Sequence, residues 1–205
     1  MTLIVGILLY DEVEILDFAG PFQVFTTATR VYARAHPDSP RLFEVMTIAA
    51  DSQPVLARGG LQVLPSHTFD NPAHLDVLIV PGGIHTAQLE RRSVIEWIAR
   101  KASETTITAS VCTGAFLLAK AGLLDGKSVT THWEDIQDLR KMFPNILVRE
   151  NQRWVDEGRI VTSAGISAGI DMSLYLVARL ADHELAVKTA RQMEYDWREG
   201  DGHDR

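Results

Sequence analysis

Short apolar segments alternate with segments of helical periodicity along nearly all of the 205 residues. Some of the apolar segments carry no polar residue, as at Leu78–Val80, and such strands are typical of a sheet that is covered on both faces. Strands that are separated by helices imply right-handed parallel crossovers. The pattern therefore predicts an α/β fold, a doubly wound sandwich with a mostly parallel sheet and helices on both faces.

The hydrophobic pattern also places the individual elements. We expect strands at 3–9, 42–50, 77–80, 106–111, 127–131 and 146–149, and helices at 17–34, 86–102, 114–122, 133–142, 168–180 and 183–197. Hairpins are expected around residues 58–60 and at the turn 157–158. In such folds ligands bind beyond the carboxyl ends of the strands, so the loops after residues 9, 80, 111 and 131 should form the site.

Composition and charge narrow the class of protein. With 46% hydrophobic and 23% charged residues, the chain is predicted to form one domain over residues 1–198, followed by a polar tail at 199–205. A net charge of −7 argues against nucleic acid as a partner, because phosphate binding relies on clustered Lys and Arg. No apolar run approaches the roughly 20 residues of a membrane span, so no membrane partner is expected.

Cys112 is the single cysteine of the chain. One cysteine forms no internal disulfide and no zinc site of several thiolates, and the seven histidines show no pair at helical ligand spacing. The chain also starts without a basic leader or cleavage site. These features predict a cytoplasmic protein without a metal.

Cys112 follows a predicted strand and precedes a predicted helix. Ser110 and Gly114, two residues before and after it, are as small as a nucleophile elbow requires. The amides at the start of a helix favour a thiolate over a thiol, which predicts a nucleophilic cysteine. The alternative is a cysteine that only fills space in the core, as most buried cysteines do.

Pro81-Gly82-Gly83 follows another buried strand. Two glycines expose backbone amides without the obstruction of a Cβ. Together with the amide of Thr113, one of these amides is predicted to stabilise an oxyanion above Cys112. Most Pro-Gly-Gly sequences are simple turns, and the functional interpretation depends on the loop lying beside the cysteine.

Asp17 lies between Leu16 and Phe18. Apolar neighbours desolvate a carboxyl group and raise its pKa, so that it can exchange protons with a thiol. The alternative is an N-cap for the helix that follows, since Asp is favoured at that position. The residues alone leave both interpretations open.

Two further polar residues are candidates for a supporting role. His132 ends a predicted strand and should face the same cleft as Cys112, although most histidines at strand ends are structural. His132 and Glu134 have the spacing of a glutaminase base pair. This segment lies early in the chain and enters a helix, so we set the pair aside. Asp171 lies in the first turns of a late helix, where an acid complements the helix dipole.

Taken together, five segments resemble the DJ-1/PfpI (ThiJ) superfamily, and the resemblance spans nearly the whole chain. It implies a flavodoxin-like fold of the class I glutamine amidotransferase type and a cytoplasmic homodimer without metal or organic cofactor. The segments are Leu16–Pro21, Val80–Gly83, Ser110–Gly114, Thr130–Trp133 and Gly165–Asp171.

Within the superfamily, Asp17 and the pair Cys112-Thr113 are most similar to the isocyanide hydratase branch. The resemblance implies that Cys112 attacks an isocyanide carbon, that Asp17 moves protons, and that the Gly83 and Thr113 amides hold negative charge on the way to an N-formamide. Two alternatives stay open. One is a nonenzymatic ligand or redox sensor, and the other is a glyoxalase-like enzyme for 2-oxoaldehydes with His132 as base.

Overall fold

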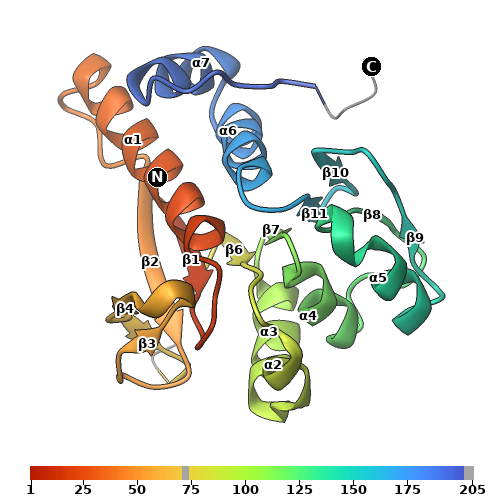
Figure 1. The fold of residues 1–205 in the computed structure, drawn as a ribbon. Coiled ribbons are helices and arrows are strands. Elements are labelled where there is room, and N and C mark those ends of the chain that lie inside the picture. The colour runs from red at the N-terminus through yellow and green to blue at the C-terminus, as the bar shows by residue number, and fades with distance from the viewer. Residues whose placement is uncertain (71–73, 201–205) are drawn as a thin grey trace.

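A seven-stranded sheet forms the centre of the computed structural model, which describes residues 1–70 and 74–200. The strand order is β10-β11-β7-β6-β1-β2-β5, and every neighbouring pair is parallel except β10 and β11. The mostly parallel doubly wound sheet is therefore confirmed (Figure 1). The strands are β1 (Leu3–Leu8), β2 (Phe43–Ala49), β5 (His67–Thr68), β6 (Val77–Val80), β7 (Ile107–Val111), β10 (Trp154–Asp156) and β11 (Ile160–Ser163).

Helices cover the sheet in two groups (Figure 1). The first group is α1 (Ile15–Ala35), α6 (Ala168–Leu180) and α7 (His183–Gln192), which pack against one another. The second group is α2 (Thr86–Glu90), α3 (Arg92–Glu104) and α4 (Gly114–Lys120). All residues of β6 and β7 are buried between these layers, which explains why β6 is a continuous apolar run.

Both predicted hairpins are present. β3 (Val55–Leu56) and β4 (Gln62–Val63) pair antiparallel around a 3₁₀ turn at Arg58–Gly60. β10 and β11 pair antiparallel across Gly158, which has a φ of 79°. Glycine at such a turn supplies a left-handed backbone without steric cost.

The middle of the chain differs from the prediction. The expected helix 86–102 is interrupted at Arg91, whose ψ of 90° separates α2 from α3. β8 (Ser128–Val129) is shorter than the expected strand 127–131 and pairs with β9 (Leu147–Val148) in a separate two-stranded sheet. The expected helix 133–142 begins as a 3₁₀ turn, Trp133–Asp135, before α5 (Ile136–Met142).

The last helix ends at Gln192 and not at Trp197. Glu194 adopts a φ of 51°, and the segment beyond it is held by tertiary bonds: Trp197 Nε1 donates to the Asp171 carbonyl at 3.2 Å and the Arg198 amide donates to Asp171 Oδ1 at 3.1 Å. Residues 201–205 of the predicted polar tail lie outside the described residues. None of the helices in the described ranges combines the length and apolar composition of a membrane span.

Candidate active site

Cys112 lies on the sharp turn between β7 and α4, as the elbow pattern predicts. Its φ of 55° is in the left-handed region, which costs a residue with a Cβ about 1–2 kcal/mol. Three hydrogen bonds to residues distant in the chain hold this backbone. The Cys112 amide donates to the carbonyls of Ser163 and Ala164 at 3.2 and 3.3 Å, and its carbonyl accepts from Thr131 Oγ1 at 2.8 Å.

Gly114 has the close approach that the elbow requires. A Cβ at this position would lie 2.1 Å from the Val80 carbonyl oxygen, which belongs to the neighbouring strand and cannot move away cheaply. We expect Gly114→Ala to lower the free energy of unfolding by about 3 kcal/mol, the upper range of overpacking, as measured by urea denaturation.

Gly126→Ala is the matched control, because a Cβ there meets nothing within 4 Å and only the φ of 72° opposes it. It should cost about 1 kcal/mol. Equal losses in the two variants would contradict the packing argument.

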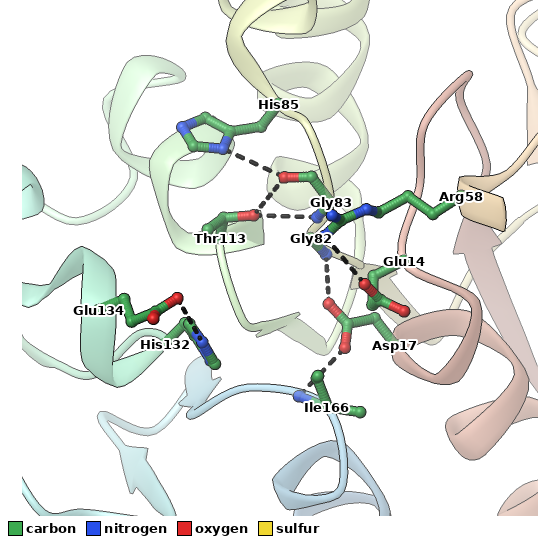
Figure 2. A network of polar contacts seen from close by, with 10 residues as sticks. All are labelled: Glu14, Asp17, Arg58, Gly82, Gly83, His85, Thr113, His132, Glu134 and Ile166. Atoms are coloured by element: carbon green, nitrogen blue, oxygen red, sulfur yellow. Dashed lines mark hydrogen bonds and ion pairs between the residues drawn. The ribbon is translucent and has the colours of Figure 1, made fainter.

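Asp17 lies in the first turn of α1 and is completely buried. Its Oδ2 accepts a hydrogen bond from the Gly82 amide at 3.0 Å, and its Oδ1 accepts one from the Ile166 amide at 3.2 Å (Figure 2). The N-cap of α1 is Glu14, so the N-cap interpretation of Asp17 is wrong. Three loops, those after β1, β6 and β11, therefore converge on this carboxyl group.

Asp17 and Cys112 lie close enough for each to shift the pKa of the other. Burial raises the pKa of Asp17 to about 7, against the opposing effect of the Gly82 and Ile166 amides. Burial also raises the pKa of the Cys112 thiol, the charge of Asp17 raises it further, and the Thr113 amide lowers it. The prediction that helix amides keep Cys112 as a thiolate is therefore wrong, because desolvation outweighs the amides of a seven-residue helix.

The raised pKa of Asp17 predicts a pH-dependent stability. The folded state holds this proton more tightly than the unfolded chain, in which the pKa is 3.8. Stability is therefore highest below pH 4 and is lost as the pH rises towards 7. Between pH 5 and 8 the native protein should lose about 2 kcal/mol that Asp17→Asn does not lose, as measured by urea denaturation at both values. Parallel pH profiles would show that Asp17 is not the titrating group.

The amides that were predicted to form an oxyanion hole are already engaged. The Gly82 amide binds Asp17, and the Gly83 amide donates to Thr113 Oγ1 at 3.0 Å. Thr113 Oγ1 in turn donates to the Gly83 carbonyl at 3.0 Å (Figure 2). The Gly82 and Gly83 amides are thus bound within the protein in this arrangement, and the oxyanion role of Gly82, Gly83 and Thr113 stays a prediction. These groups position the acid and the thiol.

A pocket of about 260 Å³ opens beside Cys112. His132 lines it, as predicted, and Nε2 of His132 lies 3.6 Å from Glu134 Oε2 (Figure 2). The pair that the sequence analysis set aside is thus formed. In the described part of the chain, buried Nδ1 of His132 has no hydrogen-bond partner. The full lining is Glu14, Arg58, Gly83, Ile84, His85, Thr86, Cys112, Thr113, His132, Glu134, Asp135 and Ile166.

Sequence reasoning missed several charged or aromatic residues of this pocket. His85 stacks on Phe116 with 4.4 Å between ring centroids, and burial lowers its pKa. Arg58 pairs with Glu14 at 3.2 Å (Figure 2). His85 stands two residues after Gly83, a signal that was available, whereas nothing in the spacing of Arg58 points to the site.

Asp171 does not belong to this site. It is completely buried, forms an ion pair with Arg153, and accepts a hydrogen bond from the Arg198 amide. Burial raises its pKa, against the effect of the Arg198 amide and Arg153. Its bonds hold the C-terminal segment against α6, and its supporting role near Cys112 stays a prediction.

No group of three or more His, Cys, Asp or Glu residues in the ranges 1–70 and 74–200 has the arrangement of a metal site. The chemistry available at Cys112 from the described residues is nucleophilic attack by sulfur combined with proton transfer by a carboxyl group of pKa about 7.

Known proteins with similar sequences fall into enzymes and regulators. Isonitrile hydratase of Pseudomonas putida is 36% identical over 196 residues, which cover 95% of this chain and 79% of that protein. The HTH-type transcriptional regulator GbdR of Pseudomonas aeruginosa is 29% identical over 94% of this chain, which spans 50% of the regulator.

Solved structures give the same fold. A ThiJ/PfpI family protein from Pseudomonas syringae superposes with a TM-score of 0.83 at 29% identity, over 96% of this chain and 76% of that one. Drosophila melanogaster DJ-1beta superposes with a TM-score of 0.79 at 20% identity, over 96% of this chain and 100% of that one. The profile of the DJ-1/PfpI family matches residues 4–179. On this evidence the chain is a member of the DJ-1/PfpI family.

Proposed function

We propose that this protein is a cysteine-dependent hydratase that adds water to an isocyanide and releases an N-formamide. The observation that carries the proposal is that Cys112 lines a pocket and has the buried carboxyl group of Asp17 nearby, which two backbone amides hold in place. The similarity to isonitrile hydratase, an isonitrile being an isocyanide, supports the same reaction.

The first half of the reaction forms a covalent intermediate. Ionised Asp17 accepts the thiol proton of Cys112, and the sulfur attacks the terminal carbon of the isocyanide, for which a soft nucleophile is well suited. Asp17 then delivers this proton to the same carbon. The product is a thioimidate, in which a new S–C bond and a new C–H bond replace the S–H bond and one carbon–nitrogen π bond.

The second half consumes one water. Asp17 accepts a proton from the water as its oxygen attacks the thioimidate carbon, and the proton passes to the nitrogen. The tetrahedral adduct then expels the sulfur, the hydroxyl proton returns to Cys112 through Asp17, and the N-formamide leaves. A carboxyl group with a pKa of about 7 accepts and donates protons with nearly equal ease at neutral pH, which these alternating steps require.

A turnover assay on a small panel of isocyanides tests the proposal, with the formamide detected directly. We expect formamide to form in amounts far above the enzyme concentration. Methylglyoxal in a parallel assay identifies a glyoxalase-like activity, and turnover of methylglyoxal without any formamide would overturn the hydratase.

A nonenzymatic sensor is the second candidate. It is favoured by the similarity to GbdR, which extends over 94% of this chain. Peroxide treatment separates the two, because a hydratase loses turnover when Cys112 is oxidised. A sensor responds to peroxide selectively and has no turnover to lose.

We further propose that the protein acts in the cytoplasm as a homodimer. The lone cysteine fits a reducing compartment. Exposed apolar side chains on the β3–β4 hairpin and the loop after β6 offer a surface for a second copy: Leu56, Leu61, Leu64 and Ile84 are each 44–69% exposed. Light scattering at micromolar concentration should give about twice the chain mass of 22.8 kDa. A mass equal to that of one chain would contradict the proposed homodimer.

A further inference from the structure

The charges that line the Cys112 pocket are unequal. Three carboxylates, Glu14, Glu134 and Asp135, face one guanidinium, Arg58. Two of the acids have partners, since Glu14 pairs with Arg58 at 3.2 Å and Glu134 with His132 at 3.6 Å. Within residues 1–70 and 74–200, these partners leave Asp135 as the acid of the lining whose carboxylate forms no ion pair.

The side chain of Asp135 has no structural task in the described part of the chain. Asp135 is the N-cap of α5, a position at which Asp normally accepts a hydrogen bond from the helix, yet its side chain makes no capping bond. Burial raises the pKa of Asp135, His132 and His85 oppose this shift, and Asp138 and Glu134 add to it.

We propose that Asp135 makes the Cys112 pocket selective for electrophiles whose organic group carries a cation or an N–H donor, and that it disfavours anionic ones. An ammonium or guanidinium group beside Asp135 gains an ion pair in a partly desolvated place. A carboxylate or sulfonate at the same place meets a charge of its own sign. For the proposed hydratase, the preferred substrate class is an isocyanide with an amine-bearing organic group.

Alkylthiolation of Cys112 tests the charge preference without any assumption about turnover. Two methanethiosulfonates of similar size are compared, one with a trimethylammonium-ethyl group and one with a sulfonatoethyl group. Each converts the thiol to a mixed disulfide and releases methanesulfinic acid. Because Cys112 is the single cysteine, mass spectrometry follows one site, and each rate is divided by the rate with free 2-mercaptoethanol.

We expect the cationic reagent to react about tenfold faster than the anionic one after this normalisation, and Asp135→Asn to remove most of that ratio. Asp138→Asn is the matched control: it removes the same charge from the same helix at an exposed position outside the pocket lining. Its ratio should stay within twofold of the native value. Equal rates in the native protein, a ratio insensitive to Asp135→Asn, or no reaction with either reagent would each overturn the proposal.

The statement about isocyanides rests on the proposed function and has its own measurement. The ratio of kcat/KM for an isocyanide with an ammonium group to that for one with a carboxylate should fall about tenfold in Asp135→Asn. Absence of turnover with both compounds, together with an intact charge preference in alkylthiolation, would reject the hydratase and keep the selective pocket. Turnover without a charge preference in alkylthiolation would reject the selective pocket and keep the hydratase.

Discussion

Cys112→Ala should fold normally and form no formamide from any isocyanide. The reaction proposed here passes through a bond between carbon and sulfur, and alanine provides no nucleophile in its place. Loss of a covalent nucleophile typically removes several orders of magnitude of rate. The measurement is formamide release at high enzyme concentration, with mass spectrometry of the native protein under substrate to detect the thioimidate.

The fold of this variant is expected to persist because the strained backbone is held from outside the side chain. The Cys112 amide and carbonyl keep their bonds to the loop after β11 and to Thr131, and an alanine tolerates the φ of 55° no worse than a cysteine. Its unfolding midpoint in urea should lie close to the native one. Formamide production at the native rate would show that catalysis is not covalent.

The sheet and the elbow were predictable because local patterns determine them. Residue type alone indicates burial for the apolar residues of β6 and β7 and for the small residues Ser110 and Gly114. The same holds for the tight turn at Gly158. These features depend only on residues close together in the chain, so they can be predicted without knowledge of the tertiary structure.

The bonding of the site was not predictable in the same way. Whether the Gly83 amide faces a substrate or Thr113 depends on a contact between residues 30 positions apart, and the ion pair of Asp171 joins it to Arg153 in a separate segment of the chain. The predicted end of the last helix was wrong for the same reason, since hydrogen bonds from Trp197 and Arg198 to Asp171 override a helical pattern. Tertiary bonds decide these cases, and no periodicity records them.

Asp17→Asn should reduce isocyanide turnover by about 10² to 10⁴, the usual range for loss of a general acid or base. The proposed mechanism assigns each step of proton transfer to this carboxyl group, which is buried near Cys112 and has a pKa of about 7. An amide of nearly the same shape keeps one acceptor oxygen for the Gly82 or Ile166 amide but accepts no proton. The measurement is kcat/KM across pH 5 to 9, in which the native protein should show a dependence near pH 7 that the variant lacks.

Alkylation by iodoacetamide separates proton transfer from damage to the site. Removing the charge of Asp17 removes one of the influences that raise the pKa of Cys112, so the Asp17→Asn thiol should react at least as fast as the native thiol while turnover falls. Asp11→Asn removes an acid near α1 that binds the Leu56 amide outside the pocket lining, and it should leave turnover within about threefold of native. If Asp17→Asn hydrates isocyanides at the native rate, another group transfers the proton. His132 is then the residue to replace, because it lines the same pocket and pairs with Glu134. Within the described part of the chain, no other histidine of the lining has a carboxylate within 4 Å.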